Sequence, residues 1–162
     1  MAKCVFAGTF DPITIGHESI INKCCEKYSK VFVVLGKNPK KSSFFSEEER
    51  LILLKECFKS NPKVEVINFS QIENYSQYLQ NEKVSVYVRG IRNDNDLKYE
   101  EEYKLKNQEI FPFITTEFIW CDKEFSDISS TTVKSQIING NFINVPKSCR
   151  WLIEKILKQK QI

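Results

Sequence analysis

The chain has 162 residues, of which 41% are hydrophobic and 28% are charged, and its formal net charge is +3. These values are typical of a globular protein, so we interpret residues 1–162 as a single domain and exclude intrinsic disorder and fibrous structure. The mild charge gives no support for a nucleic-acid partner. No apolar run approaches the roughly 20 residues of a membrane span, so we expect no membrane partner.

Short apolar strands alternate with helical patterns along the chain. In chain order, the pattern predicts strand 3–7, helix 17–28, strand 31–35, a helix that opens with a capping box at 46–49, strand 64–67, helix 72–80, strand 84–88, helix 93–109, strand 116–120, helix 129–138 and helix 146–160. This alternation is typical of an α/β protein with βαβ units. We therefore expect a Rossmann-like fold, in which helices cover both faces of a five-stranded parallel sheet.

Cysteine and histidine usage limits the chemistry of the site. The six cysteines have no regular spacing, which favours reduced thiols in the cytoplasm over disulfides or a zinc site. His17 is the only histidine, so a metal site with several histidines is excluded. We expect no metal ion held by the protein itself.

Ligands of parallel sheets bind beyond the carboxyl ends of the strands, and the first strand is followed there by Gly8–His17. Amides at a helix N-terminus bind anions, Thr9 adds a hydroxyl, and His17 can donate to a phosphate oxygen. The plainer interpretation is a strand–turn–helix corner with Thr14 as a cap and an incidental histidine. We favour the functional interpretation, because this loop precedes the chain's only histidine.

Three further segments follow strands at the same edge of the sheet. The segment 37–43 contains Lys40 and Lys41, and a solvated basic loop is its plainer interpretation. The segment 89–92 holds two arginines, whose planar forks suit phosphate, although pairing with Asp94, Asp96 or Glu100 is the alternative. The segment 129–132 is typical of a helix cap, and a capped helix N-terminus can also bind phosphate.

Several motifs of the chain resemble those of one family. They are the stretch GTFDPIT with IGH (8–17), Lys40-Lys41 ahead of 45–50, VRGIR (88–92), Asp96, Tyr99-Glu100, Asn107 and ISSTTVK (128–134). The first is similar to the (H/T)xGH signature of nucleotidyltransferases, in the form seen in the bacterial phosphopantetheine adenylyltransferase family. The resemblance covers most of the chain, and the motifs occur in the same order and at compatible spacing.

The resemblance implies transfer of the adenylyl group of ATP to 4′-phosphopantetheine, giving dephospho-coenzyme A and pyrophosphate. It implies that catalysis uses His17, Lys41 and Arg92, and that the acceptor meets Thr9, Lys41, Tyr75 and Arg89. It implies that ATP meets Thr9, Phe10, His17, Gly90, Ile91, Arg92, Glu100, Phe125, Ser126, Asp127, Ile128, Ser129, Ser130 and Thr131. It further implies Mg²⁺ carried in with ATP, a cytoplasmic enzyme and a homohexamer.

Two alternatives remain, and the second belongs to a different class of protein. One is a sister nucleotidyltransferase with another phosphorylated acceptor, such as nicotinamide mononucleotide, against which Thr14 and the segment 89–92 count. The other is a nucleotide-binding module without turnover. The chain also departs from the family pattern at Ile15, Phe125 and Asp127. An acidic side chain at 127 would repel a triphosphate unless it points outward or meets a cation.

Overall fold

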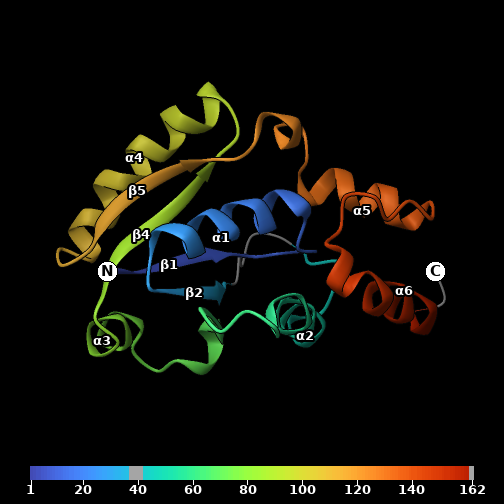
Figure 1. The fold of residues 1–162 in the computed structure, drawn as a ribbon, viewed down its shortest axis with the longest axis horizontal. Coiled ribbons are helices and arrows are strands. Elements are labelled where there is room, and N and C mark those ends of the chain that lie inside the picture. The colour runs from blue at the N-terminus through green and yellow to red at the C-terminus, as the bar shows by residue number, and fades with distance from the viewer. Residues whose placement is uncertain (37–41, 161–162) are drawn as a thin grey trace.

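The computed structural model describes residues 1–36 and 42–160 and contains a five-stranded parallel sheet (Figure 1). Its strands are β1 (Lys3–Gly8), β2 (Lys30–Leu35), β3 (Val64–Asn68), β4 (Val84–Ile91) and β5 (Thr115–Trp120). They lie in the order β3-β2-β1-β4-β5, and every neighbouring pair is parallel. The predicted α/β fold class is therefore confirmed.

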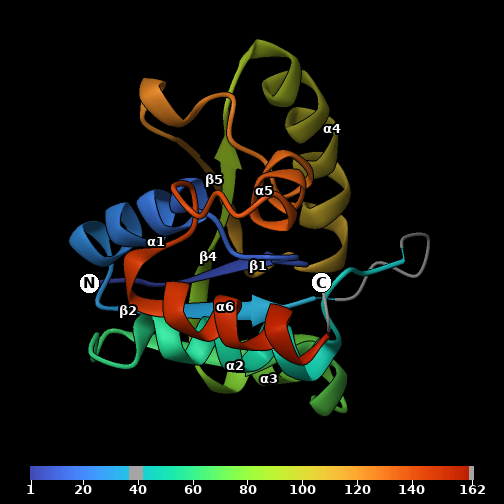
Figure 2. The same cartoon turned by 90° about the vertical axis from the view of Figure 1, so that its right-hand side faces the viewer.

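Helices cover both faces of this sheet (Figure 2). They are α1 (Ile15–Lys27), α2 (Glu47–Phe58), α3 (Tyr75–Asn81), α4 (Asp94–Ile110), α5 (Ser130–Ile138) and α6 (Arg150–Gln159). Buried side chains of α1, α2, α5 and α6 belong to one hydrophobic cluster with β1 and β2, whereas Leu79 of α3 and Phe111 after α4 belong to the other. Figure 1 shows α5 and α6 beyond the carboxyl ends of the strands.

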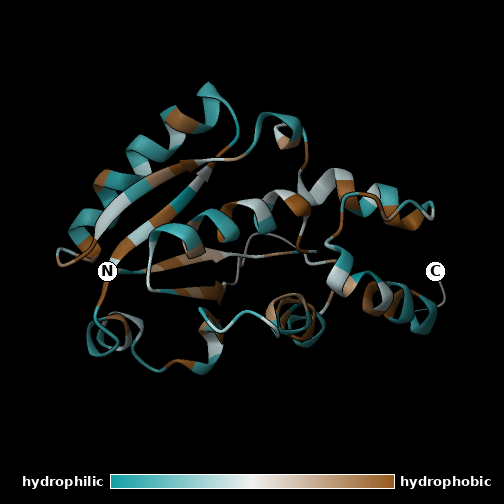
Figure 3. Cartoon of the chain, in the orientation of Figure 1, coloured by the Kyte–Doolittle hydropathy of each residue, from teal (hydrophilic) through white to brown (hydrophobic). Residues whose placement is uncertain are grey.

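Alternation of side chains along the central strands explains how one sheet serves two cores. In β2, Val31, Val33 and Leu35 are buried in the first cluster, while Phe32 and Val34 are buried in the second. Successive side chains of a strand point to opposite faces, so a continuous apolar run suits a strand covered on both sides. In Figure 3 the apolar strand β2 is largely brown, whereas α4, which has one face in solvent, is mostly teal.

Three elements differ from the sequence prediction. β4 continues to Ile91, so residues 89–91 lie within the strand, paired with Phe118, Ile119 and Trp120 of β5, rather than after it. The predicted helix 72–80 begins only at Tyr75, because Phe69–Gln71 forms a 3₁₀ turn and Asn74 is the N-cap. The predicted C-terminal helix starts as a separate 3₁₀ turn at Lys147–Cys149 before α6.

The strand order reverses between β1 and β4, because β2 and β3 lie to one side of β1 and β5 lies beyond β4. In open α/β sheets such a switch point opens a crevice at the carboxyl ends of the strands. Both strands end in the segments that the sequence marked as functional, Gly8 in β1 and 89–91 in β4. Within the described part of the chain, no helix is both long and apolar enough to cross a membrane.

Candidate active site

A cavity of about 390 Å³ lies at this switch point. Its wall is built by the end of β1 and the loop after it, the first turn of α1, the end of β4, the start of α4 and the segment from β5 to α5. The residues that line it include Thr9, Phe10, Thr14, Gly16, His17, Arg89, Gly90, Ile91, Arg92, Asp96, Glu100, Cys121, Phe125, Ile128, Ser129, Ser130 and Thr131. The topology thus brings three separate parts of the sequence, within 6–20, 89–100 and 121–131, to one site.

His17 is held by a reciprocal capping box at the N-terminus of α1. The Thr14 hydroxyl oxygen accepts a hydrogen bond from the His17 amide at 3.2 Å, and the Thr14 amide donates to Nδ1 of His17 at 3.1 Å. Because Nδ1 accepts this bond, the neutral ring carries its proton on Nε2. The cap predicted at Thr14 is therefore present, and it also leaves His17 with a donor for a ligand.

The surroundings of His17 keep the ring neutral. Burial, and secondarily the positive charge of Arg92, lower the pKa of His17 from 6.5 to about 4. The imidazole is therefore uncharged at neutral pH, where it acts as a hydrogen-bond donor rather than a cation.

The loop after β1 packs tightly against His17. Phe10 is 2% exposed, and its ring meets the imidazole edge to face, with ring centroids 5.0 Å apart at 73°. A Cβ atom at Gly8 would lie only 3.2 Å from this phenylalanine ring, so the position favours glycine. Phe10 itself has a positive φ of 45°, which a non-glycine residue adopts only where its surroundings impose it.

Arg89 reaches the cavity from β4 and is fixed from two directions. Its Nε and Nη2 atoms donate to the Glu100 carboxylate at 2.7 and 3.0 Å, and its guanidinium lies 4.1 Å from the ring centroid of Tyr103. Burial alone would lower the pKa of Arg89, but the Glu100 carboxylate outweighs it and the pKa is raised. The side chain is therefore a fixed cation, and its arrangement matches the carboxylate pairing weighed from the sequence.

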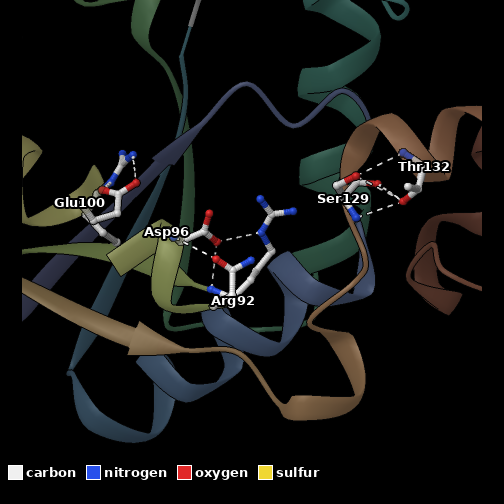
Figure 4. Close-up of polar contacts among 7 residues, drawn as sticks. Arg92, Asp96, Glu100, Ser129 and Thr132 are labelled. Atoms are coloured by element: carbon white, nitrogen blue, oxygen red, sulfur yellow. Dashed lines mark hydrogen bonds and ion pairs between the residues drawn. The ribbon is translucent and has the colours of Figure 1, made fainter. Parts of the chain in front are cut away.

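Arg92 forms a second pair with the same helix (Figure 4). Its backbone amide and its Nε both donate to Oδ2 of Asp96, at 3.1 and 3.0 Å. These bonds engage one edge of the guanidinium, so within the described residues the terminal Nη groups stay available to a ligand. Figure 4 shows Glu100 one turn further along α4 than Asp96, so two successive turns of one helix orient the two arginines.

The opposite wall is the N-terminus of α5, where Ser129 is the N-cap. Ser129 and Thr132 exchange side-chain and backbone hydrogen bonds of 3.1 and 3.2 Å (Figure 4). The Ser130 hydroxyl donates to the carbonyl of Pro12 at 3.0 Å, which ties α5 to the loop after β1. The amides of Ser130 and Thr131 belong to the first turn, which cannot satisfy them within the helix, so they suit an anion.

A second cavity, of about 470 Å³, lies beside the first, and Ala7 lines both. It is lined mainly by aromatic and aliphatic side chains: Val34, Phe69, Tyr75, Tyr87, Tyr103, Ile110 and Phe111. The Tyr75 hydroxyl is buried near the Tyr87 side chain, but among the described residues no partner meets it with hydrogen-bond geometry. Burial raises the pKa of Tyr75 to about 12. Because buried hydroxyls normally have a partner, this one suits a polar group of a ligand.

Most of the predicted ATP-site residues line the first cavity, but two do not. Ser126 and Asp127 are absent from its wall as described, because the Ile128 amide donates to the Phe125 carbonyl and leaves both at the outer side of a turn. Asp127 is exposed there, which meets the condition that it point outward. Tyr75 lines the second cavity, and Lys41 lies outside the described residues.

Among the wall residues that were not predicted as site residues, Asp96 and Cys121 carry ionisable side chains. The sequence indicated Asp96 as part of a motif and as one possible partner of the two arginines, and its four-residue spacing from Arg92 is the signal for the pair that the structure shows. The described residues contain no group of three or more histidine, cysteine or acidic side chains that could hold a metal ion. The carboxylates on the cavity wall are instead engaged by arginines.

Comparison with known proteins agrees with this geometry. Residues 5–136 match the model of the cytidylyltransferase-like family, and the chain belongs to this class of nucleotidyltransferases. The phosphopantetheine adenylyltransferase of Carboxydothermus hydrogenoformans is 36% identical over 86% of this chain and 85% of its own. The proteins of the same name from Chromobacterium violaceum and Clostridium tetani are 37% identical over 85% of this chain and 83% of their own, and 35% identical over 98% of both chains. The chain thus belongs to the phosphopantetheine adenylyltransferase family.

Proposed function

We propose that the chain transfers the adenylyl group of ATP to 4′-phosphopantetheine, releasing pyrophosphate and forming dephospho-coenzyme A. The observation that carries this proposal is the set of anion-binding groups around one cavity. Two helix N-termini, a neutral histidine donor and two oriented arginines meet there. Such a set suits the phosphates of two substrates held side by side.

The chemistry requires positioning more than proton transfer. An oxygen of the acceptor phosphate attacks the α-phosphorus of ATP, the new P–O bond forms, and the bond to the pyrophosphate oxygen breaks. The second pKa of a phosphate monoester is about 6, so the nucleophile is ionised at neutral pH and needs no general base. Catalysis then comes from orientation and from neutralising charge around the α-phosphate.

His17 and Arg92 are suited to the nucleotide side of this reaction. The Nε2–H group of His17 donates to an oxygen of the α-phosphate, and the Thr14 amide keeps the ring in the tautomer that can donate. Arg92 contributes positive charge through its terminal nitrogens while Asp96 holds its Nε. The first amides of α5 bind the remaining phosphates. Lys41, outside the described residues, stays a proposed third cation.

The acceptor side uses Thr9, Arg89 and the second cavity. Arg89 offers charge to the acceptor phosphate, and Thr9 orients the same group. The pantetheine arm then extends past Ala7 into the aromatic cavity, where the unpartnered Tyr75 hydroxyl can bond one of its amides. This assignment explains why the polar and the apolar cavity adjoin.

Mg²⁺ would arrive with ATP, bound by phosphate oxygens, and would supply neutralisation of charge on the leaving pyrophosphate. This proposal is consistent with the cavity carboxylates being engaged by arginines rather than free as a cage. We further propose a homohexamer that acts in the cytoplasm. Six free cysteines agree with a reducing compartment.

The proposed function is tested by measuring pyrophosphate release from ATP with a panel of acceptors. We expect release with 4′-phosphopantetheine and none above background with nicotinamide mononucleotide or a simple phosphorylated alcohol. In the variant His17→Ala, loss of a donor that acts in the transition state should lower the rate about 100- to 1000-fold. ATP affinity should change much less. Release with another acceptor would favour a sister enzyme, and tight ATP binding without release would favour a module without turnover.

A further inference from the structure

Arg50 is a buried charged residue that the proposed mechanism does not use. It lies in the first turns of α2, is 5% exposed, and does not line the active-site cavity. Its Nε donates to the carbonyl of Phe45 at 3.2 Å, and its Nη1 donates to the carbonyl of Thr9 at 2.9 Å. Among the described residues, this guanidinium bonds to main-chain carbonyls and to no carboxylate. A buried charge without an opposite charge is costly to maintain, so its contacts call for a reason.

The bond to Thr9 fixes the peptide that leads into the strained residue of the site. The Thr9 carbonyl belongs to the Thr9–Phe10 peptide, so holding its oxygen sets the plane from which Phe10 departs with φ of 45°. In that conformation the Phe10 ring packs edge-on against His17. A chain of direct contacts therefore runs from α2 through the loop after β1 to the proposed catalytic histidine.

The other bond of Arg50, to the Phe45 carbonyl, has a counterpart at the amide of the same residue. The Asp11 carboxylate accepts hydrogen bonds from the amides of Phe44 and Phe45, both at 2.8 Å. Phe45 is thus held at its carbonyl by Arg50 and at its amide by Asp11. Since Phe45 is fully buried, the start of α2 is a rigid base for the loop after β1.

We propose that Arg50 is a positioning residue for adenylyl transfer, which clamps the Thr9–Phe10 peptide to α2 and so holds Thr9 and His17 at the reacting phosphates. This inference rests on the proposed function. It assigns no contact between Arg50 and either substrate. Its role requires two donors of the guanidinium, because the Thr9 carbonyl lies in the loop after β1 and the Phe45 carbonyl lies at the start of α2.

The test compares Arg50→Met with the matched control Lys55→Met, an exposed residue of the same helix. With ATP and 4′-phosphopantetheine, Arg50→Met should lower kcat about ten- to a hundredfold, because a displacement of about 1 Å at a reacting group has an effect of this size. The KM for ATP should change less than about threefold. Lys55→Met should behave as wild type.

A second measurement, the NMR titration of His17, reports on the site in the absence of turnover. His17 is the only histidine, so its NMR titration is unambiguous. Loosening of Phe10 should raise the midpoint in Arg50→Met from about 4 toward 6.5, and Lys55→Met should leave it unchanged. Arg50→Lys keeps the charge but lacks the fork, so it should lie between Arg50→Met and wild type in both measurements.

The outcomes separate this inference from the function on which it rests. An inactive wild type would overturn the proposed function, whereas a shifted His17 midpoint in Arg50→Met would still support the clamp. Unchanged kcat and midpoint in folded Arg50→Met would overturn the clamp while leaving the function intact. If Arg50→Met does not fold, Arg50→Lys decides by the same two measurements. Unfolding of both variants would also overturn the inference, since it would make Arg50 a residue of the general core.

Discussion

Acidification should lower the free energy of unfolding of this protein, and His17 should add a contribution of its own to that of the carboxylates. The pKa of His17 is lowered from 6.5 to about 4 by burial and by Arg92. Between these pH values the unfolded chain binds a proton that the folded chain does not, so stability falls as the pH falls. The slope is up to about 1.4 kcal/mol for each pH unit, which gives about 2–3 kcal/mol between about pH 7 and about pH 4.5.

The assay is urea unfolding at a series of pH values, with wild type compared against His17→Gln. Glutamine at this position of a capping box can accept the hydrogen bond from the Thr14 amide as the imidazole does, but its side chain does not titrate. Carboxylates contribute equally to both proteins, so the difference between the two curves isolates His17. We expect the stability of wild type to fall by about 2–3 kcal/mol more than that of His17→Gln over this range. Parallel curves, or an NMR midpoint of His17 near 6.5, would refute the reasoning.

Three further substitutions probe the two substrate ends and the thiols. Arg89→Ala should raise the acceptor's KM about ten- to a hundredfold, with little change in calorimetric ATP binding, because it removes the proposed charge-assisted contact to the acceptor phosphate. Loss of ATP binding with acceptor binding retained would place Arg89 on the ATP side of the site instead. Ser130→Ala should weaken ATP more than the acceptor, because it frees α5 from the Pro12 carbonyl, and equal weakening of both would contradict this. Cys121→Ser should keep wild-type turnover although Cys121 lines the cavity, since phosphate is the nucleophile, and inactivity of the folded variant would assign a thiol to the reaction.

The sequence predicts the framework of this fold because its signals are local. Buried strands appear as β-branched runs, as in β2, and the capping residues Ser46 and Ser129 indicate where α2 and α5 begin. The end of β4 gives no such signal. Arg89 and Gly90 interrupt its apolar run, and they become strand only because β5 pairs with them.

For the site, the sequence predicts which segments meet but not how their side chains pair. The motif at 8–17 and the topology together indicate which segments meet, and the cavity wall agrees. The sequence left open whether the arginines pair with carboxylates of α4, because that choice depends on packing against Tyr103 and on burial. The clamp formed by Arg50 joins residues 41 positions apart, and no local pattern indicates such a contact.

The most direct test of the proposed reaction follows the α-phosphate of ATP. The protein is incubated with Mg²⁺, 4′-phosphopantetheine and ATP labelled at the α-phosphate, and the labelled product is identified by mass spectrometry. The account predicts label in dephospho-coenzyme A, with pyrophosphate released in equal amount and with both products nearly lost in His17→Ala. Label in free AMP, or label retained entirely in ATP while wild type binds both substrates, would contradict adenylyl transfer as the function of this site.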